Sequence, residues 1–147
     1  MPFHIIRHDI TKVEADAVVN TANPKPVIGS GTDSAVYEAA GKEKLLAERE
    51  KIGEIKPGQS SYTSAFDLPA KYIIHCVDTF WEDGAHGEWD ILRSCCRTAL
   101  ALAVQLKCKS IAFPLMATGA YGYPKAEALD AAFREIGRFR LKIKKTR

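Results

Sequence analysis

The sequence has little that would place it in a membrane or in an oxidising compartment. No apolar run among its 147 residues approaches the length of a membrane span, and the first ten residues, MPFHIIRHDI, lack the charged start and apolar core of a signal peptide. No C-x-x-C pair is present, which argues against a zinc knuckle, and we expect reduced, buried thiols at Cys76, Cys95, Cys96 and Cys108. These absences predict a cytoplasmic protein without a membrane partner.

Metal ligands are also sparse. His4 and His8 are four residues apart, a spacing that suits a metal site on a helix, but the intervening Ile5, Ile6 and Arg7 are typical of a strand. The pattern also lacks the glutamate that accompanies catalytic zinc ligands. We therefore predict no metal ion and no other cofactor.

The net charge of +3 comes from the C-terminal segment. Residues 138–147, RFRLKIKKTR, contain six basic residues and no acidic one, whereas the rest of the chain carries 15 basic against 18 acidic side chains. Since no basic stripe occurs elsewhere, we expect a solvated edge and no nucleic-acid partner. The alternative, an RNA-associated role for this segment, predicts binding that falls steeply with salt.

Short apolar segments alternate with helical patterns along the chain. Strands are predicted from β-branched and aromatic residues at 3–7, 17–20, 72–77 and 110–115. Apolar residues at three- and four-residue steps predict helices at 34–51, 88–107 and 125–137. In 138–147 apolar and basic residues alternate, which predicts a final edge strand. The pattern indicates an α/β fold, and residues 1–147 are expected to form one monomeric domain.

Two glycine-containing loops follow predicted strands of this sheet. The loop NPKPVIGSGTD, 23–33, comes after Asn20, and the loop ATGAYGYP, 117–124, comes after the strand at 110–115. Glycines let backbone approach a ligand, and the helices that follow present unpaired N–H groups, so two such loops suit two phosphates. Position 34 is Ser34 where G-x-G-x-x-G needs its third glycine, and no Walker lysine follows either loop, which disfavours a standard dinucleotide or P-loop site.

In these segments the sequence resembles the macrodomain family of ADP-ribose-binding modules. The matching segments occur in the family's order and spacing: HDIT (8–11), DAVVNTAN (16–23), GSGTDSAVYEAAG (29–41), LPAKYIIHCV (68–77) and IAFPLMATGAYGYP (111–124). The resemblance implies a three-layer α/β/α fold with a central mixed sheet. It is strongest to the MacroD-type hydrolase branch, which removes ADP-ribose from proteins and deacetylates O-acetyl-ADP-ribose.

The resemblance also implies a set of ligand contacts. The expected ligand-binding residues are Asp9, Ile10, Ala22, Asn23, Gly29, Ser30, Gly31, Asp33, Thr118, Gly119, Ala120 and Tyr121. Asp9 would accept a proton of the adenine amino group while the Ile10 backbone orients the ring, and the glycine loops would hold the diphosphate through backbone N–H groups. Tyr121 would pack beside the distal ribose or, alternatively, cover the edge of the core. Asn20 is expected to brace the loop backbone.

Asn23 and Asp33 are the expected catalytic residues. Asn23 would hydrogen-bond the distal ribose, and the resemblance implies that Asp33 positions or activates water near the anomeric carbon. An aspartate before a helix is also a good N-cap, worth about 1 kcal/mol. The predicted function is ADP-ribose binding with hydrolysis of ADP-ribosyl ester linkages, on ADP-ribosylated proteins or O-acetyl-ADP-ribose. The alternative is a non-catalytic ADP-ribose reader.

Three features depart from the branch, and the first two, at Tyr37 and in the glycine loop, favour that alternative. Tyr37 stands where the branch usually has histidine, and a phenol cannot become a cation. Ile28 and Ser30 occupy positions that are often glycine, which reshapes the rim of the ribose site. The domain is also expected to be short at its C-terminal end, without the aromatic residue that stacks on adenine, a contact worth about 1–3 kcal/mol.

Overall fold

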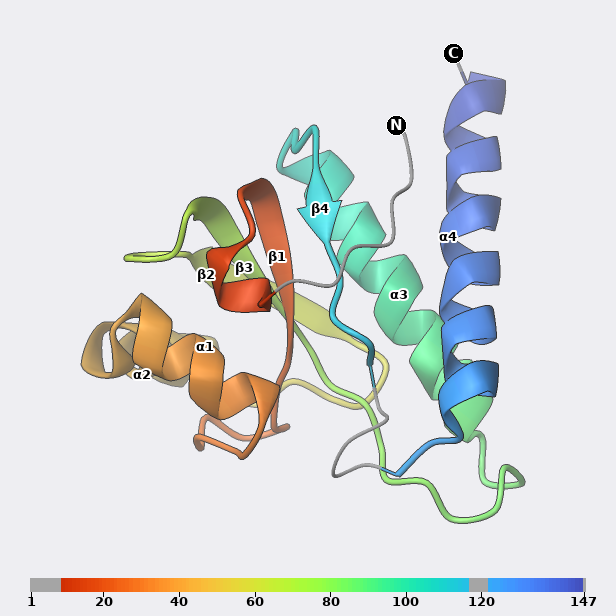
Figure 1. Cartoon of the computed structure of the whole chain (residues 1–147), viewed down its shortest axis with the longest axis horizontal. Coiled ribbons are helices and arrows are strands. Elements are labelled where there is room, and N and C mark those ends of the chain that lie inside the picture. Colours follow the sequence, from red (N-terminus) through yellow and green to blue (C-terminus); the bar gives the residue numbers. More distant parts are fainter. Residues whose placement is uncertain (1–8, 117–121, 147) are drawn as a thin grey trace.

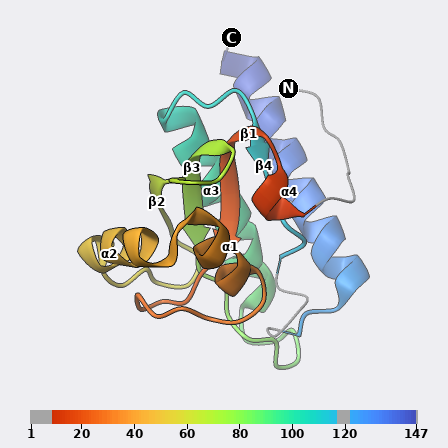
Figure 2. The same ribbon diagram turned by 60° about the vertical axis from the view of Figure 1, so that its left-hand side comes forward.

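The computed structural model describes residues 9–116 and 122–146, with side chains up to Arg138. The described elements are, in chain order, η1 (Ile10–Lys12), β1 (Ala15–Thr21), α1 (Thr32–Ala40), α2 (Lys42–Ile52), β2 (Ser60–Ser64), β3 (Ala70–Cys76), α3 (Glu88–Gln105), β4 (Ile111–Ala112) and α4 (Lys125–Thr146). The four strands of this part of the chain form one sheet in the order β2-β3-β1-β4. Helices α1 and α2 lie on one side of it and α3 and α4 on the other, as Figures 1 and 2 show. The predicted three-layer fold is confirmed, whereas the strand predicted at 3–7 lies outside the described residues.

Strands β1 and β3 form the centre of the sheet because both are apolar on two faces. They pair in parallel, with Val18 opposite Ile73 and Val19 opposite Ile74. Val18 and Ile73 pack into the core beneath α1 and α2, and Val19 and Ile74 into the core beneath α3. The carboxyl ends of both strands therefore meet at one edge of the sheet.

The outer strands depart from the predictions. Strand β4 pairs in parallel with β1, but over Ile111–Ala112 alone, so the prediction of a strand at 110–115 is too long. Pro114 has no N–H to donate to a ladder, which limits the strand. Strand β2 pairs antiparallel with β3, making the sheet mixed. It was not predicted, because its sequence, SSYTS, contains no aliphatic residue.

Gly41 divides the helix predicted at 34–51 into α1 and α2. Its φ is +109°, a conformation that residues with a side chain rarely adopt, and it is both the C-cap of α1 and the N-cap of α2. The apolar spacing alone did not indicate this break. The single-helix prediction was therefore wrong at this one residue.

Helix α4 continues through the segment that was predicted as an edge strand. It extends from Lys125 to Thr146, so the strand prediction for 138–147 is wrong. In the sequence Ala132, Ile136, Phe139 and Ile143 are also separated by four, three and four residues, which is helical spacing. Lysine, arginine and leucine are good helix formers, and no proline interrupts the segment.

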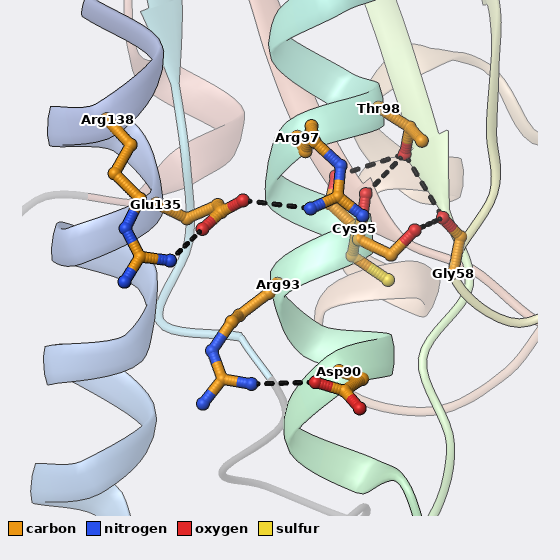
Figure 3. Close-up of polar contacts among 9 residues, drawn as sticks. Gly58, Asp90, Arg93, Cys95, Arg97, Thr98, Glu135 and Arg138 are labelled. Atoms are coloured by element: carbon orange, nitrogen blue, oxygen red, sulfur yellow. Dashed lines mark hydrogen bonds and ion pairs between the residues drawn. The ribbon is translucent and has the colours of Figure 1, made fainter. Parts of the chain in front are cut away.

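Polar contacts connect α3 to α4 on one side and to the chain before β2 on the other (Figure 3). Arg97 of α3 forms an ion pair of 3.0 Å with Glu135 of α4, whose side chain is buried. On the opposite side of α3, Thr98 Oγ1 donates a hydrogen bond to the Gly58 carbonyl oxygen at 3.3 Å. These contacts hold α3 between the sheet and α4.

The prediction of reduced thiols is confirmed, and the prediction of burial holds for three of the four, because Cys108 is only partly buried. All four thiols are free, and Cys76, Cys95 and Cys96 are buried between the sheet and α3. Burial raises the pKa of Cys96 to about 12, so this group is a neutral thiol. In the part of the chain that the structure describes, no helix has the length and apolar character needed to cross a membrane.

Candidate active site

The loop after β1 converges on the carboxylate of Asp33. Asp33 lies in the first turn of α1 and is 5% exposed. Its Oδ1 accepts a hydrogen bond of 2.7 Å from Asn20 Nδ2, and its Oδ2 accepts one of 2.7 Å from the Gly29 N–H. The N-cap of α1 is Gly31, so the N-cap alternative for Asp33 is wrong. Its carboxylate instead joins the end of β1 to the glycine loop.

Burial and hydrogen bonding act on Asp33 in opposite directions. Burial raises its pKa because a desolvated carboxylate is less stable. The hydrogen bonds from Asn20 and Gly29 and the positive charge of Arg49 lower the pKa, and the net shift is upward. A partly desolvated carboxylate of this kind is a better hydrogen-bond acceptor for water than one at the surface.

Asn23 and Asp33 meet at Gly29. A Cβ added at Gly29 would lie 3.0 Å from Asn23 Nδ2 and 3.3 Å from Asp33 Oδ2, so both polar groups approach the same point of the backbone. Asn23 Nδ2 donates a 2.7 Å hydrogen bond to the Val27 carbonyl oxygen, which fixes the loop. The structure thus brings together the two residues predicted to be catalytic.

Arg49 donates hydrogen bonds to the loop that follows β1, a role that the sequence did not predict. Its side chain is 1% exposed, and it donates hydrogen bonds to the carbonyl oxygens of Gly53 at 2.8 Å, Asn23 at 2.9 Å and Lys25 at 3.3 Å. In the sequence Arg49 is one of many charged residues in α2, KEKLLAEREKI, and nothing distinguishes it from a solvated side chain. Its role depends on contacts with residues far away in the chain.

Tyr37 lies one turn after Asp33 and is buried. Burial raises the pKa of its phenol, and the negative charge of Asp33 raises it further. Tyr37 is therefore a neutral group beneath the loop, packed in the same core as Ile28. The structure places it where it supports the loop rather than where it could supply a cation.

Asn20 does not brace the loop backbone as predicted. Its amide nitrogen contacts the Asp33 carboxylate and the ring of His75 instead. Ala22 is buried, and its N–H donates to the Cys76 carbonyl oxygen at 2.8 Å, so the chain remains attached to β3 after β1 ends. The loop begins from a fixed point at the carboxyl edge of the sheet.

Asp9 and Ile10 lie at η1, which contacts α1. Asp9 Oδ1 accepts hydrogen bonds from the Thr11 N–H at 2.9 Å and from Thr11 Oγ1 at 2.8 Å, which caps this short helix. Ile10 packs against the core beneath α1. The structure therefore places both predicted adenine-binding residues on the α1 side of the sheet.

The second predicted loop is described only at its end. Thr118, Gly119, Ala120 and Tyr121 lie outside the described residues. The next aromatic residue, Tyr123, is buried, and its hydroxyl oxygen lies 2.9 Å from both Asp78 Oδ1 and the Glu88 carbonyl oxygen, which share its one hydrogen. Trp81 and Trp89 pack on its ring, with centroids 5.3 and 5.6 Å away. These contacts anchor the end of the second loop where α4 begins.

One group of described side chains has the spacing of metal ligands, but its atoms are already engaged. Asp83, His86 and Glu88 place their ligand atoms within 4.8 Å of one another. Glu88 Oε2 accepts the N–H groups of residues 82, 83 and 84, and Oε1 accepts that of His86. Burial raises the pKa of Glu88, but these bonds outweigh it and hold the pKa at about 2. The Glu88 carboxylate therefore holds together the loop that precedes α3. His4 and His8 lie outside the described residues.

Comparison with known proteins decides the family. A family model described as the Macro domain matches residues 19–132. The chain belongs to the macro domain family. In this macro domain the matched region contains Asn20, Asn23, Gly29 and Asp33, the residues that meet at the carboxyl edge of the sheet.

Curated relatives and solved structures agree with this assignment. The chain is 42% identical over 133 residues to a macro domain-containing protein of Chlorobaculum tepidum, covering 90% of this chain and 77% of the relative. It is 43% identical over 139 residues to a Citrobacter rodentium protein named O-acetyl-ADP-ribose deacetylase, covering 92% and 78%. A variant of the Oceanobacillus iheyensis macrodomain with ADPR is 38% identical with a TM-score of 0.81, covering 88% of this chain and 73% of that one.

Proposed function

We propose that this macro domain binds ADP-ribose and hydrolyses ADP-ribosyl ester linkages, as a mono-ADP-ribosyl-protein hydrolase or an O-acetyl-ADP-ribose deacetylase. The observation that carries the proposal is the buried Asp33 carboxylate, held by Asn20 and Gly29 beside Asn23. The deacetylase name of a relative 43% identical to this chain supports the reaction class. The ADPR in the similar solved structure supports the ligand.

The proposed ligand-binding residues divide into three groups. Asp9 and Ile10 would recognise adenine, by a carboxylate that accepts the amino proton and by the adjacent backbone. The glycine loop 29–31 and the loop 118–121 would hold the diphosphate through N–H donors, and the N–H groups in the first turn of α1 have no partners within the helix. Ala22 and Asn23 would contact the distal ribose. Such a site needs no arginine clamp, because backbone dipoles supply the positive potential.

Asp33 would act on water rather than as a nucleophile. With an ADP-ribosylated protein, a water molecule hydrogen-bonded to its carboxylate would attack the carbon at the anomeric centre, and the ester carboxylate would leave with the bonding electrons. With O-acetyl-ADP-ribose the water would instead attack the acetyl carbonyl carbon, and the ribose oxygen would leave and take up a proton. The water proton would pass to the ligand's diphosphate or to Asp33. The protein's contribution is mainly orientation, since Asn23 fixes the ribose and Asp33 fixes the water.

A time course of ADP-ribose release from a protein modified on an acidic residue tests the reaction. We expect steady release by the wild-type protein and a rate lower by about 10²–10³-fold for Asp33→Ala. Asp130→Ala is the matched control, because Asp130 is an exposed aspartate of α4 that pairs only with Arg134 among the described residues. Equal rates for Asp33→Ala and wild type would contradict the catalytic assignment.

A reader without turnover is the second candidate, and the burial of Tyr37 favours it. The phenol is neutral and lies beneath the loop, so it provides no cation in place of the branch's histidine. A reader that retains Asp9 and Asp33 would bind ADP-ribose but would release no ADP-ribose from the modified protein. The same time course, run beside a binding measurement, separates the two candidates.

A further inference from the structure

A chain of hydrogen bonds crosses the sheet from Asp33 to β2. Asn20 Nδ2 lies 2.7 Å from Asp33 Oδ1 and 3.3 Å from His75 Nδ1. On the other side of the imidazole, Nε2 lies 3.1 Å from Thr63 Oγ1. Thr63 Oγ1 donates in turn to the Ser64 carbonyl oxygen at 2.9 Å. The chain therefore joins the carboxylate to the backbone of the edge strand.

The strand register places these side chains on one face of the sheet. Asn20 of β1 is opposite His75 of β3, and Thr63 of β2 is opposite Ile73, two residues before His75 and on the same face. Asn20 and His75 are fully buried, and Thr63 is 5% exposed. Because the environment excludes water, each of these polar groups must be satisfied by its neighbours.

With the Asn20 amide oriented as in the structure, one arrangement of protons satisfies the chain. Both hydrogens of Asn20 Nδ2 point outward, one to the Asp33 carboxylate and one to His75, so His75 Nδ1 must accept. His75 then carries its proton on Nε2 and donates to Thr63 Oγ1. Burial and, to a smaller extent, the positive charge of Arg49 lower the pKa of His75 to about 3, so the ring is neutral.

Asn20 Oδ1 is the exception, since it has no hydrogen-bond partner among the described residues. If the amide turned over, this oxygen would face the Asp33 carboxyl group, which could donate to it only when protonated. The turned amide would also set its oxygen against His75 Nδ1, acceptor against acceptor, unless the ring proton moved to Nδ1. Thr63 Oγ1 would then have to leave the Ser64 carbonyl oxygen in order to donate to Nε2. His75 therefore disfavours the turned amide, and with it the protonated form of Asp33.

We propose that His75 is a positioning residue for the reaction, because its Nδ1 fixes the Asn20 amide with the N–H groups toward Asp33 and so keeps Asp33 ionised. This inference rests on the proposed function for its consequence, since an ionised Asp33 is the form that orients water. The geometry itself does not depend on turnover. The described ionisable groups nearest Asp33 besides His75 are Tyr37 on α1 and Arg49 on α2.

The test compares two substitutions of nearly equal polarity. His75→Asn retains an acceptor at the position of Nδ1, and His75→Gln retains a polar group near Thr63 but loses that acceptor. The readout is the NMR titration of the Asp33 carboxyl carbon in the ligand-free protein. We expect His75→Gln to raise the pKa of Asp33 by about half a unit or more, and His75→Asn to leave it close to wild type.

Ile73→Ala controls for loss of packing, because Ile73 lies on the same strand and face but outside the hydrogen-bonded chain. It should lower stability without moving the Asp33 titration. In an active protein, His75→Gln should also shift the acid limb of the pH–rate profile to higher pH. An unchanged Asp33 titration in His75→Gln, or an equal shift in Ile73→Ala, would overturn the proposal. Absence of ADP-ribose release in the wild type would refute the proposed function instead, and the titration would still decide the role of His75.

Discussion

Arg49 shows how one buried charge can shape the candidate site. It is the largest fully buried side chain of the described residues, and its guanidinium donates to three backbone carbonyl oxygens, two of them in the loop after β1. The fork of donors suits several acceptors at fixed angles, which a lysine could not match. Arg49 also lies close enough to Asp33 for its charge to lower that residue's pKa.

Removing this side chain should loosen the loop and the fold together. Arg49→Ala leaves three carbonyl oxygens without a donor, and we expect the free energy of unfolding to fall by about 3–5 kcal/mol. Lys51→Ala, an exposed position of the same helix, should change it by less than about 0.5 kcal/mol. Urea unfolding of the two variants measures both values, and similar midpoints would refute the structural role of Arg49.

Asp78 should make stability depend on pH. It is 3% exposed, and burial raises its pKa to about 6 although hydrogen bonds from the Thr79 N–H and the Tyr123 hydroxyl lower it. The pKa in the unfolded chain is about 3.9, so the folded state binds more protons between these values. Stability contributed by protonated Asp78 is therefore complete below about pH 4 and is lost as the pH rises through about 6.

Asp78→Asn should accordingly stabilise the protein at neutral pH. The amide oxygen can still accept from Thr79 and Tyr123 without a buried charge, and we expect a gain of about 1–2 kcal/mol near pH 7.5. The gain should fall as the pH drops from about 6 and vanish below about pH 4. Unfolding curves for wild type and variant across this range test the sign, and a gain that grew as the pH fell would contradict it.

At the scale of the elements, the break between helices α1 and α2 depends on the conformation of Gly41. Gly41→Ala should destabilise the protein by about 1–2 kcal/mol, because its φ of +109° strains a residue with a Cβ. Gly137→Ala is the matched control: it lies inside α4, and a Cβ there meets no atom within 4 Å. It should stabilise by about 0.5–1 kcal/mol. Thermal unfolding measures both changes, and shifts of the same sign would contradict the helix assignments.

Elements with an apolar signal were predictable, and those held by long-range contacts were not. The continuous apolar residues of β1 and β3 and the apolar stripe of α3 set their structure directly. Strand β2 forms by pairing with the edge of β3. The polar sequence of β2 alone does not indicate a strand. Residues 138–146 fit both a period of two and helical spacing, and in the structure they continue the helix that begins at Lys125.

The residues of the candidate site also divide into those that the sequence predicted and those that it did not. Asn23, Gly29 and Asp33 were predicted because they lie in one short segment that has an unusual composition and resembles the macrodomain family. Arg49 and His75 were missed, since their partners are distant in sequence: 26 residues separate Arg49 from Asn23, and 55 separate His75 from Asn20. No local pattern signals such a contact.

For the whole molecule, the three layers explain why the site forms at one edge. Strands β1, β3 and β4 run in parallel, so the chain leaves each of them on the same side of the sheet. Helix α1 begins there, with Asp33 in its first turn, and α4 begins there at Lys125, after Tyr123. The ligand would therefore be bound by backbone and side-chain amide groups from both halves of the sequence, rather than by one motif.

Calorimetric titration of the intact chain with ADP-ribose, with AMP as the comparison ligand, tests this claim most directly. We predict one-to-one binding of ADP-ribose that is tighter than that of AMP by about tenfold or more, because the second phosphate and the distal ribose are both recognised. No detectable heat with ADP-ribose, or equal affinity for AMP, would show that the two loops do not form the proposed site.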